Sequence, residues 1–248
     1  MERILLGIDV GGSSIKAGLV DVEAGRLVSE LISTPTPQPA SPQAVVDAIA
    51  KLVSRMPKSD GPVGFAFPSV VKNGKARTAA NVDRAWIGTD GAALLGDALG
   101  RKVVFLNDAD AAGIAEMHVG AGRGLRGTVI VLTFGTGIGS ALFNDGVLWP
   151  NTEFGHVEFH GKDAELWASA RVRTEERLDF PAWIERVNEF LAYMHGLLWP
   201  DAFIFGGGVS DRFDEFSSLL RSPCPVYPAR LGSQAGVIGA ALAAAHFG

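Results

Sequence analysis

The sequence is poor in cysteine, with Cys224 as the one thiol among 248 residues. One thiol forbids an intrachain disulfide, and it excludes a zinc or iron–sulfur site built from several thiolates. A chain of this length buries a substantial core without such cross-links. Apolar residues make up 47% and charged residues 20% of the sequence, which argues against disorder over most of its length.

Positive charge and long apolar runs are also scarce. The 22 basic residues are outnumbered by 27 acidic ones, so the chain has no global basic signature for nucleic acid or an anionic membrane. No run of about 18 apolar residues is free of polar interruption, so no membrane span is expected. The first ten residues are typical of a strand rather than of a signal peptide, and the expected compartment is the cytoplasm.

Glycine, by contrast, is abundant, with 31 residues, and several glycines directly follow apolar runs typical of strands. The segment Ile4–Asp9 predicts a strand, which a glycine turn joins to a second strand over Ile15–Val20. The same order of strand, glycine turn and strand recurs from Thr128 to Phe143. The two copies match at an offset of 124 residues, as between Asp9 and Thr133. We therefore expect two duplicated α/β lobes, residues 1–107 and 108–248, with a cleft between them and with the C-terminal helix able to pack back on the first lobe.

The remaining elements follow from apolar spacing and turn signals. The pairs Asn73-Gly74 and Asp145-Gly146 predict hairpin turns. Further strands are expected over Val63–Val71, Lys102–Leu106 and Ala202–Phe205. Helices are expected over Pro42–Arg55, Asp90–Leu99, Asp163–Arg177, Pro181–Leu198, Asp211–Leu220 and Ala235–Ala245, with another beginning at Ala109.

The glycine turns are candidate phosphate sites, because a backbone without side chains lets amide groups approach an anion closely. Asp9 ends the first strand and suits Mg²⁺. The alternative is an ordinary glycine hairpin in which Asp9 accepts turn hydrogen bonds. The residues proposed for the phosphate donor are Asp9, Gly11, Gly12, Ser13, Ser14 and Lys16 in the first turn, and Thr133, Gly135, Thr136 and Gly137 in the second.

A third glycine cluster follows the strand Ala202–Phe205. Gly207 and Gly208 offer a flat backbone against which a nucleotide base or ribose packs. The alternative is a tight turn into a helix, with Ser210 as the N-cap.

Three places carry side chains suited to the chemistry of a hydroxyl group. Asp108 follows a strand at the sheet edge where α/β proteins bind ligands, and its carboxylate suits a general base; the alternative is a helix N-cap. Glu153 and His156 are separated by Phe154 and Gly155, and their side chains suit sugar hydroxyls; the alternative is a polar surface loop. Glu165 begins a predicted helix, where the dipole alone favours a carboxylate.

Taken in order, these segments resemble the ROK (repressor, ORF, kinase) family of sugar kinases. The resemblance covers nearly the whole chain and implies the actin-like, ribonuclease H-like ATPase fold. Its motifs are Asp9–Lys16, Leu106–Ala111, Thr133–Ser140, Glu153–His156 and Ala235–Ala241.

The sequence departs from most of the family after His156. A cysteine-rich zinc motif usually follows, but Val157–Asp163 contains no cysteine, so no zinc site is expected. This zinc-less form resembles the polyphosphate glucokinase branch, as do Thr78–Asp90, Pro150–Glu153 and Gly161–Glu165.

The resemblance implies phosphoryl transfer to the 6-hydroxyl of glucose, with Mg²⁺ near Asp9 and with polyphosphate, ATP or both as donor. Asp108 is then the general base, and the sugar is held by Asn81, Asn107, Asp108, Glu153, His156 and Glu165. Candidate basic residues along the path of a polyphosphate chain are Lys72, Lys75, Arg77, Arg84, Arg123 and Arg126, for which a solvated basic face is the alternative.

Competing functions within the family are an ATP-only hexose kinase, a non-catalytic sugar sensor and a repressor. A repressor of this family carries an N-terminal helix-turn-helix domain, whereas the first predicted strand here begins at residue 4. A homodimer is common in the family.

Overall fold

The computed structural model describes residues 3–80 and 82–248. It contains two compact units, the first formed by the chain up to His118 together with Gln234–Gly248, and the second by Val119–Ser233. The division falls after α3 (Asp108–His118) rather than after Asn107. The reason is that α3 packs on the terminal helix α7 (Ala235–Phe247), which lies in the first unit.

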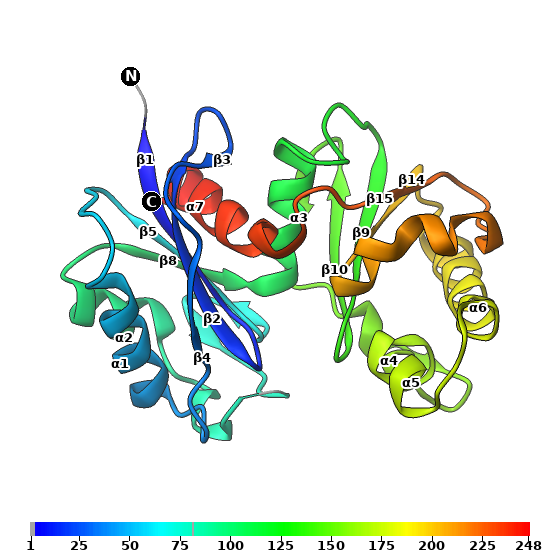
Figure 1. Cartoon of the computed structure of the whole chain (residues 1–248), viewed down its shortest axis with the longest axis horizontal. Helices are drawn as coiled ribbons and strands as arrows, with labels where there is room; N and C mark the ends of the chain where they lie inside the picture. Colours follow the sequence, from blue (N-terminus) through cyan, green and yellow to red (C-terminus); the bar gives the residue numbers. More distant parts are fainter. Residues whose placement is uncertain (1–2, 81) are drawn as a thin grey trace. The chain divides into compact units, whose positions relative to one another are not determined.

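The first unit is built on a mixed sheet (Figure 1). In this sheet β1 pairs antiparallel with β2 and parallel with β5, and β5 pairs parallel with β8. Strand β4 pairs with β2 beside β3. The sheet order is β3 (Arg26–Leu27), β2 (Ser14–Asp21), β1 (Ile4–Val10), β5 (Val63–Phe67) and β8 (Val103–Asn107), with β4 at Ile32–Pro35.

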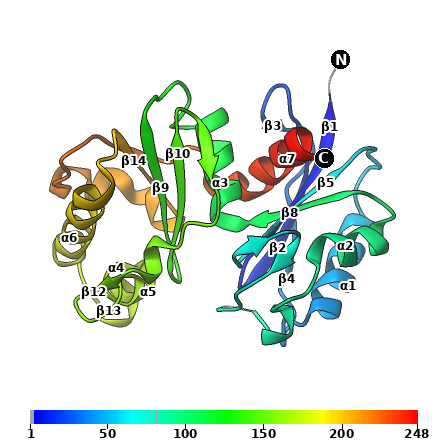
Figure 2. The same cartoon turned by 180° about the vertical axis from the view of Figure 1, so that it is seen from behind.

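The two faces of this sheet differ in side-chain size. Successive strand residues point to opposite faces, and large residues such as Ile8 and Phe65 pack with α1 (Pro42–Val53) and α2 (Gly91–Leu99). The other face carries small residues, and α7 lies against it (Figures 1 and 2). A Cβ atom on Gly64 would lie 1.9 Å from the Ala240 carbonyl oxygen, so this face requires glycine for the helix to approach.

The second unit repeats the same sheet. Strand β9 pairs antiparallel with β10 and parallel with β14, and β14 pairs parallel with β15. Helix α6 (Phe180–Leu198) packs Trp183 and Phe190 into the core formed with Leu132 and Phe205. The sheet order is β11 (Val147–Trp149), β10 (Ile138–Asn144), β9 (Thr128–Phe134), β14 (Ala202–Gly206) and β15 (Val226–Pro228).

The matching strand orders confirm the duplication predicted from the sequence. The register adds one detail, because Val10 faces Ile15 across four residues, whereas Phe134 faces Ile138 across three. The second glycine turn is thus one residue shorter, and the offset of 124 residues holds before the turns but becomes 123 after them.

Most predicted elements are present, including the hairpin turns at Asn73-Gly74 and Asp145-Gly146, where all four residues have positive φ. Three predictions were wrong in detail. The strand from Val63 ends at Phe67. The helix expected over Asp163–Arg177 is interrupted at Ser169, which is extended and caps a new helix through Val172 N. The helix expected over Asp211–Leu220 is a pair of 3₁₀ segments.

The shorter elements complete the description. Within residues 3–80 and 82–248, no helix combines the length and hydrophobicity needed to cross a membrane. The short strands are β6 (Val71–Lys72), β7 (Lys75–Ala76), β12 (Glu158–Phe159) and β13 (Lys162–Asp163). The short helices are η1 (Arg84–Trp86), η2 (Phe154–His156), α4 (Glu165–Ala168), α5 (Ala170–Glu175), η3 (Gly208–Glu215), η4 (Ser217–Leu219) and η5 (Gly232–Gln234).

Candidate functional site

The first glycine turn joins β1 to β2 and is pinned by Thr36. The Thr36 hydroxyl donates to the Gly11 carbonyl oxygen at 2.6 Å, and the Thr36 amide donates to the Ser13 carbonyl oxygen at 3.1 Å. The Gly11 amide closes the turn on the Ser14 carbonyl oxygen at 2.9 Å. Three turn carbonyls are therefore occupied by the protein, while Gly12 and Ser13 are exposed. Such a rigid, exposed glycine turn suits an anion.

Asp9 ends β1 and lies against the first turn of α7. A Cβ atom on Gly236 would lie 2.5 Å from the Asp9 carboxyl carbon, so the carboxylate meets bare helix backbone at this point. Burial and the charge of Asp108 raise the pKa of Asp9 to about 7, although Lys16 on the neighbouring strand opposes the shift. A carboxylate placed in this way gains from a bound cation.

Asp108 begins α3, but its neighbour Asn107 caps the helix. The Asn107 Oδ1 accepts from the Asp110 amide at 2.9 Å, and its Nδ2 donates to the Ser69 carbonyl oxygen at 3.1 Å. The helix N-cap considered as the alternative role of Asp108 is therefore Asn107. The Asp108 carboxylate remains a candidate general base. Burial raises the pKa of Asp108 to about 6, while a hydrogen bond from the Ala109 amide lowers it.

The raised pKa of Asp9 predicts that this carboxylate costs stability. Since the folded state binds the proton more tightly than the unfolded state, stability falls as the pH rises from about 4 to about 7. Asp9→Asn removes the charge, and we expect it to increase the free energy of unfolding at pH 8 by about 2 kcal/mol, with a gain that shrinks toward pH 5. Urea unfolding at both pH values measures this. An equal gain at pH 8 and pH 5 would contradict the assignment.

The second glycine turn is hydrogen-bonded to residues near the start of α4 and of α5. The Glu165 carboxylate accepts from the Ile138 amide at 3.3 Å, and the Arg171 amide donates to the Gly135 carbonyl oxygen at 3.0 Å. Glu165 occupies the space that a side chain on Gly137 would need. Gly135 and Thr136 are exposed. The structure thus brings Glu165, predicted to bind sugar, next to Gly137, predicted to bind phosphate.

The third glycine cluster lies directly beside the second turn. Gly207 has a φ of 88°, and a Cβ atom on it would lie 2.2 Å from the Phe134 carbonyl oxygen. Gly208 begins the 3₁₀ segment, and the Ser210 hydroxyl donates to the Gly207 carbonyl oxygen at 2.7 Å instead of capping a helix. The two donor segments predicted in the second half of the chain are therefore neighbours in the fold.

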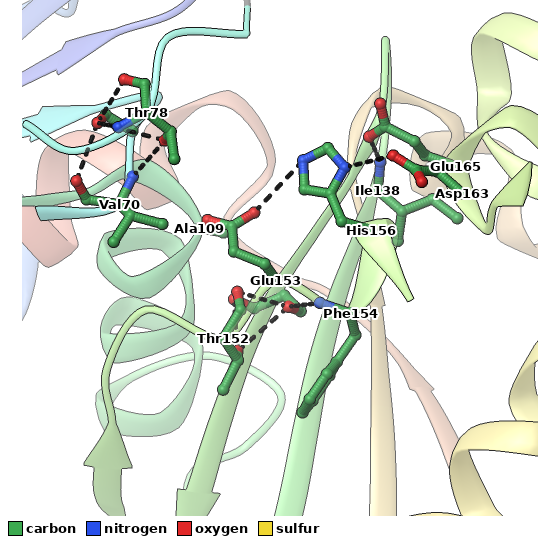
Figure 3. A network of polar contacts seen from close by, with 12 residues as sticks. Val70, Thr78, Ala109, Ile138, Thr152, Glu153, Phe154, His156, Asp163 and Glu165 are labelled. Atoms are coloured by element: carbon green, nitrogen blue, oxygen red, sulfur yellow. Dashed lines mark hydrogen bonds and ion pairs between the residues drawn. The ribbon is translucent and has the colours of Figure 1, made fainter. Parts of the chain in front are cut away.

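Ser140 holds the residues on either side of Glu153. The buried Ser140 hydroxyl donates to the Thr152 carbonyl oxygen at 2.8 Å and accepts from the Phe154 amide at 3.0 Å. Figure 3 shows Thr152, Glu153 and Phe154. These bonds fix the chain on both sides of Glu153. Next along the chain, Gly155 lies against the Ile138 carbonyl, with no room for a side chain.

His156 lies between carboxylates (Figure 3). Its Nδ1 is 2.9 Å from Asp163 Oδ2, and its Nε2 is 3.8 Å from Glu153 Oε2. The hydrogen bond to Asp163 and the charges of Glu165 and Glu153 raise the pKa of His156, although partial burial opposes the shift. In the second unit, the predicted sugar residues Glu153 and Glu165 therefore lie near the imidazole of the third, His156.

The predicted basic residues fall into two groups. Lys72, Lys75 and Arg77 are exposed on the β6–β7 hairpin. The Ala76 amide donates to the Thr89 carbonyl oxygen, and the Gly88 amide donates to the Ala76 carbonyl oxygen, so the hairpin is bonded to the segment after η1. Arg84, the first residue of η1, is exposed. Arg123 and Arg126 are exposed in the second unit, before β9. Asn81, also predicted to bind sugar, lies outside the described residues.

The profile of the ROK family matches residues 5–169, which is more than half of the chain. The chain belongs to the ROK family. The resemblance drawn from the motifs is thereby confirmed.

This ROK protein is similar to two relatives over nearly its full length. It is 48% identical to the polyphosphate glucokinase of Mycobacterium tuberculosis (strain CDC 1551 / Oshkosh), over 98% of this chain and 91% of that one. The crystal structure of the inorganic polyphosphate/ATP-glucomannokinase from Arthrobacter sp. strain KM superposes with a TM-score of 0.95 at 45% identity, covering 99% of this chain and all of that one.

A more distant ROK structure shares the fold. The ROK family glucokinase from Streptomyces griseus, solved with glucose and AMPPNP, has a TM-score of 0.83 at 27% identity, over 96% of this chain and 98% of that one. The fold of this ROK protein is the actin-like ATPase fold that the motifs predicted.

Sequence reasoning missed three residues that shape the site in this ROK protein. Thr36 pins the first turn, Gly236 admits the Asp9 carboxylate, and Asp163 holds His156. Gly236 and Asp163 lie within segments already singled out for their motifs. A glycine in the first turn of a helix rich in alanine was the available signal for Gly236. No local pattern marks Thr36, because its contact depends on strand β4.

Proposed function

We propose that this chain is a polyphosphate glucokinase, which transfers the terminal phosphoryl group of inorganic polyphosphate to the 6-hydroxyl of glucose and accepts ATP as a second donor. The observation that carries the proposal is the 48% identity, over 98% of the chain, to a polyphosphate glucokinase. The similarity to a structure named as a polyphosphate/ATP-glucomannokinase supports both donors.

Asp108 is the proposed general base. Its carboxylate accepts the proton of the 6-hydroxyl as that oxygen attacks the terminal phosphorus, and the bond to the bridging oxygen of the donor breaks. The products are glucose 6-phosphate and a chain shorter by one phosphate. A pKa of about 6 leaves Asp108 ionised at neutral pH yet more basic than an ordinary carboxylate. Asn107 supports this role by capping α3 and so fixing the backbone beside Asp108.

The sugar hydroxyls are assigned to Glu153, His156 and Glu165, with the second Nδ2 hydrogen of Asn107. Carboxylates accept hydrogen bonds from hydroxyls, and an imidazole either donates or accepts. The Glu165 carboxylate already accepts from Ile138 N, and its remaining lone pairs serve the sugar. Orientation by such contacts accounts for much of the catalysis in phosphoryl transfer.

Mg²⁺ fits Asp9. Among the described residues, no three side chains of the metal-binding kinds gather into a site, so the protein alone does not build a complete cage. Mg²⁺ commonly needs only one or two carboxylates, with phosphate oxygens and water completing the shell. Asp9 offers a carboxylate whose charge is otherwise poorly compensated. A bound Mg²⁺ supplies charge neutralisation on the donor phosphates.

The β6–β7 hairpin is the proposed surface for the polyphosphate chain. Lys72, Lys75 and Arg77 are exposed there, and none of them forms an ion pair with another described residue. The nearby Asp83 and Asp90 are engaged as helix caps, through Ala85 N and Ala93 N. A long polyanion is attracted to such a surface, and we expect ATP, with its three phosphates, to gain less from it.

The double substitution Lys72→Ala/Lys75→Ala tests this surface. At about 0.5–1 kcal/mol for each exposed charge contact, we expect the KM for polyphosphate to rise about tenfold while the KM for ATP stays within about twofold. The control is Lys51→Ala/Lys58→Ala, which removes the same charge from two other exposed positions. Steady-state kinetics with long-chain polyphosphate give the answer. Equal changes for both donors would remove the hairpin from the polyphosphate path.

Product analysis tests the reaction itself. The full chain is incubated with Mg²⁺, glucose and one donor at a time, and glucose 6-phosphate is measured with a dehydrogenase specific for it. Mannose is tested in parallel, with its phosphate ester detected by mass spectrometry, because the Arthrobacter relative is named a glucomannokinase. Formation of glucose 6-phosphate supports the proposal. Phosphorylation of another hexose but not glucose would replace it with a different kinase of the same family.

A further inference from the structure

The His156 ring is held on one side by Asp163, a carboxylate outside the set assigned to the sugar. The Nδ1–Oδ2 distance of 2.9 Å is that of a good hydrogen bond, whereas the 3.8 Å between Nε2 and Glu153 leaves that side loosely occupied. The two ring nitrogens are thus unequal, one bound firmly by the protein and one available.

A two-residue hairpin brings Asp163 back to His156. Strands β12 and β13 pair Glu158 with Asp163, and the Ala164 amide donates to the Val157 carbonyl oxygen at 3.0 Å. The turn residues His160 and Gly161 have φ values of 53° and 73°, as a tight hairpin turn requires. Because His156 and Asp163 directly adjoin the bonded pair Val157 and Ala164, this register sets their side chains next to one another.

The hydrogen bond decides which nitrogen carries the proton. An ionised carboxylate only accepts, so Nδ1 must donate to Asp163. A neutral His156 then presents the lone pair of Nε2, and a protonated one presents an N–H. The charged groups that act on this ring are Asp163 on β13, Glu165 on α4 and Glu153 before η2, and all three favour the protonated form.

We propose that Asp163 is the positioning residue for His156: its carboxylate keeps the proton on Nδ1 and directs Nε2 toward a hydroxyl of the bound sugar. The inference rests on the proposed function, since it assumes that His156 meets glucose. It assigns Asp163 no contact with the sugar.

Two substitutions at Asp163 separate charge from orientation. Asp163→Ala removes both the acceptor and the charge, and we expect the KM for glucose to rise about tenfold while kcat changes less than about threefold, as for the loss of one charge-assisted hydrogen bond. Asp163→Asn keeps an oxygen that accepts from Nδ1, so its KM stays closer to that of the wild type. Both substitutions lower the pKa of His156, because the largest contribution raising it comes from Asp163.

Imidazole nitrogen NMR of the full chain measures the pKa and the tautomer of the His156 ring directly. His156→Gln assigns the His156 signals among the five histidines. The matched control is Glu189→Gln, since Glu189 Oε2 bonds His160 Nε2 at 3.0 Å in a similarly exposed pair. This control is expected to leave the His156 titration and the KM for glucose unchanged.

The outcomes are distinguishable. A lowered pKa of His156 in both variants, with the Nδ1–H tautomer lost only in Asp163→Ala, supports the inference. A His156 titration and tautomer equal to those of the wild type in Asp163→Ala overturn it. If the wild type phosphorylates no glucose, the proposed function fails, and the NMR measurements still decide whether Asp163 positions the ring. A KM for glucose unchanged in an otherwise active Asp163→Ala enzyme overturns the inference alone.

Discussion

Asp108→Asn is expected to lower the rate of glucose phosphorylation by about 10²–10⁴-fold, the range that a positioned general base contributes. Asparagine has nearly the same shape and still accepts the Ala109 amide hydrogen, so the start of α3 is preserved. It does not take a proton at neutral pH. The base, rather than the local fold, is what this substitution removes.

Two further measurements separate this prediction from a trivial loss of fold. Glucose binding, followed by isothermal titration calorimetry, is expected to survive in Asp108→Asn within about threefold, because only one of the hydroxyl contacts is altered. The free energy of unfolding at pH 8 is expected to rise by about 1 kcal/mol, since burial raises the pKa of Asp108 to about 6 and the charge is costly in the folded state. Retention of more than a tenth of the wild-type rate would remove Asp108 from the role of base.

Gly239→Ala is expected to destabilise the protein by at least about 3 kcal/mol, the upper part of the range for overpacking in a core. A Cβ atom on Gly239 would lie 1.7 Å from the Ala111 carbonyl oxygen, which is backbone and has no alternative rotamer. Relief requires α7 and α3 to move apart. Because α7 also carries Gly236 beside Asp9, we expect the activity of Gly239→Ala to fall together with its stability.

A second helical glycine provides the matched control. Gly196 lies in α6, is exposed and has no heavy atom within 4 Å of the position its Cβ would take. Gly196→Ala should therefore stabilise the chain by about 0.5–1 kcal/mol through the lower entropy of the unfolded state. Urea unfolding of the two variants is expected to give shifts of opposite sign. Similar stabilities for the two would show that the close contact of α7 with α3 is not as described.

The local pattern of the chain predicts the strands and glycine turns well, because these features depend on short segments. Ile4–Asp9 followed by Gly11-Gly12 gives β1 and its turn, and Thr128–Thr133 gives its counterpart β9. The alanine-rich stretch near the C-terminus likewise gives α7. Apolar spacing and turn residues within each of these segments are enough to predict these elements.

The predicted helices differ from those in the structure where tertiary contacts override the local sequence pattern. The apolar spacing from Asp163 to Arg177 continues through Ser169, but Trp183 donates to the Ala168 carbonyl oxygen and Ser169 begins a new helix. In the 3₁₀ region, Phe213 and Phe216 pack on Phe205 of the sheet, which fixes a tighter winding than spacing alone indicates.

The residues of the candidate site also fall into those that a local pattern predicts and those that depend on tertiary contacts. Asp9, Asp108, Glu153 and His156 were predicted as site residues because a strand end, a glycine turn or a short motif marks each of them. Asp163 depends on the register of a hairpin, and Thr36 on the pairing of β4 with β2, neither of which is visible in a local pattern.

Transfer of phosphate from polyphosphate to glucose is the activity proposed for this chain. The most direct test measures initial rates of glucose 6-phosphate formation with Mg²⁺ and two donors, polyphosphate freed of nucleotide and ATP freed of polyphosphate. Asp108→Asn serves as the inactive control. We predict that polyphosphate supports a kcat/KM at least equal to that of ATP. Turnover with ATP alone, and none with polyphosphate, would contradict the proposed activity and leave an ATP-dependent glucokinase on the same fold.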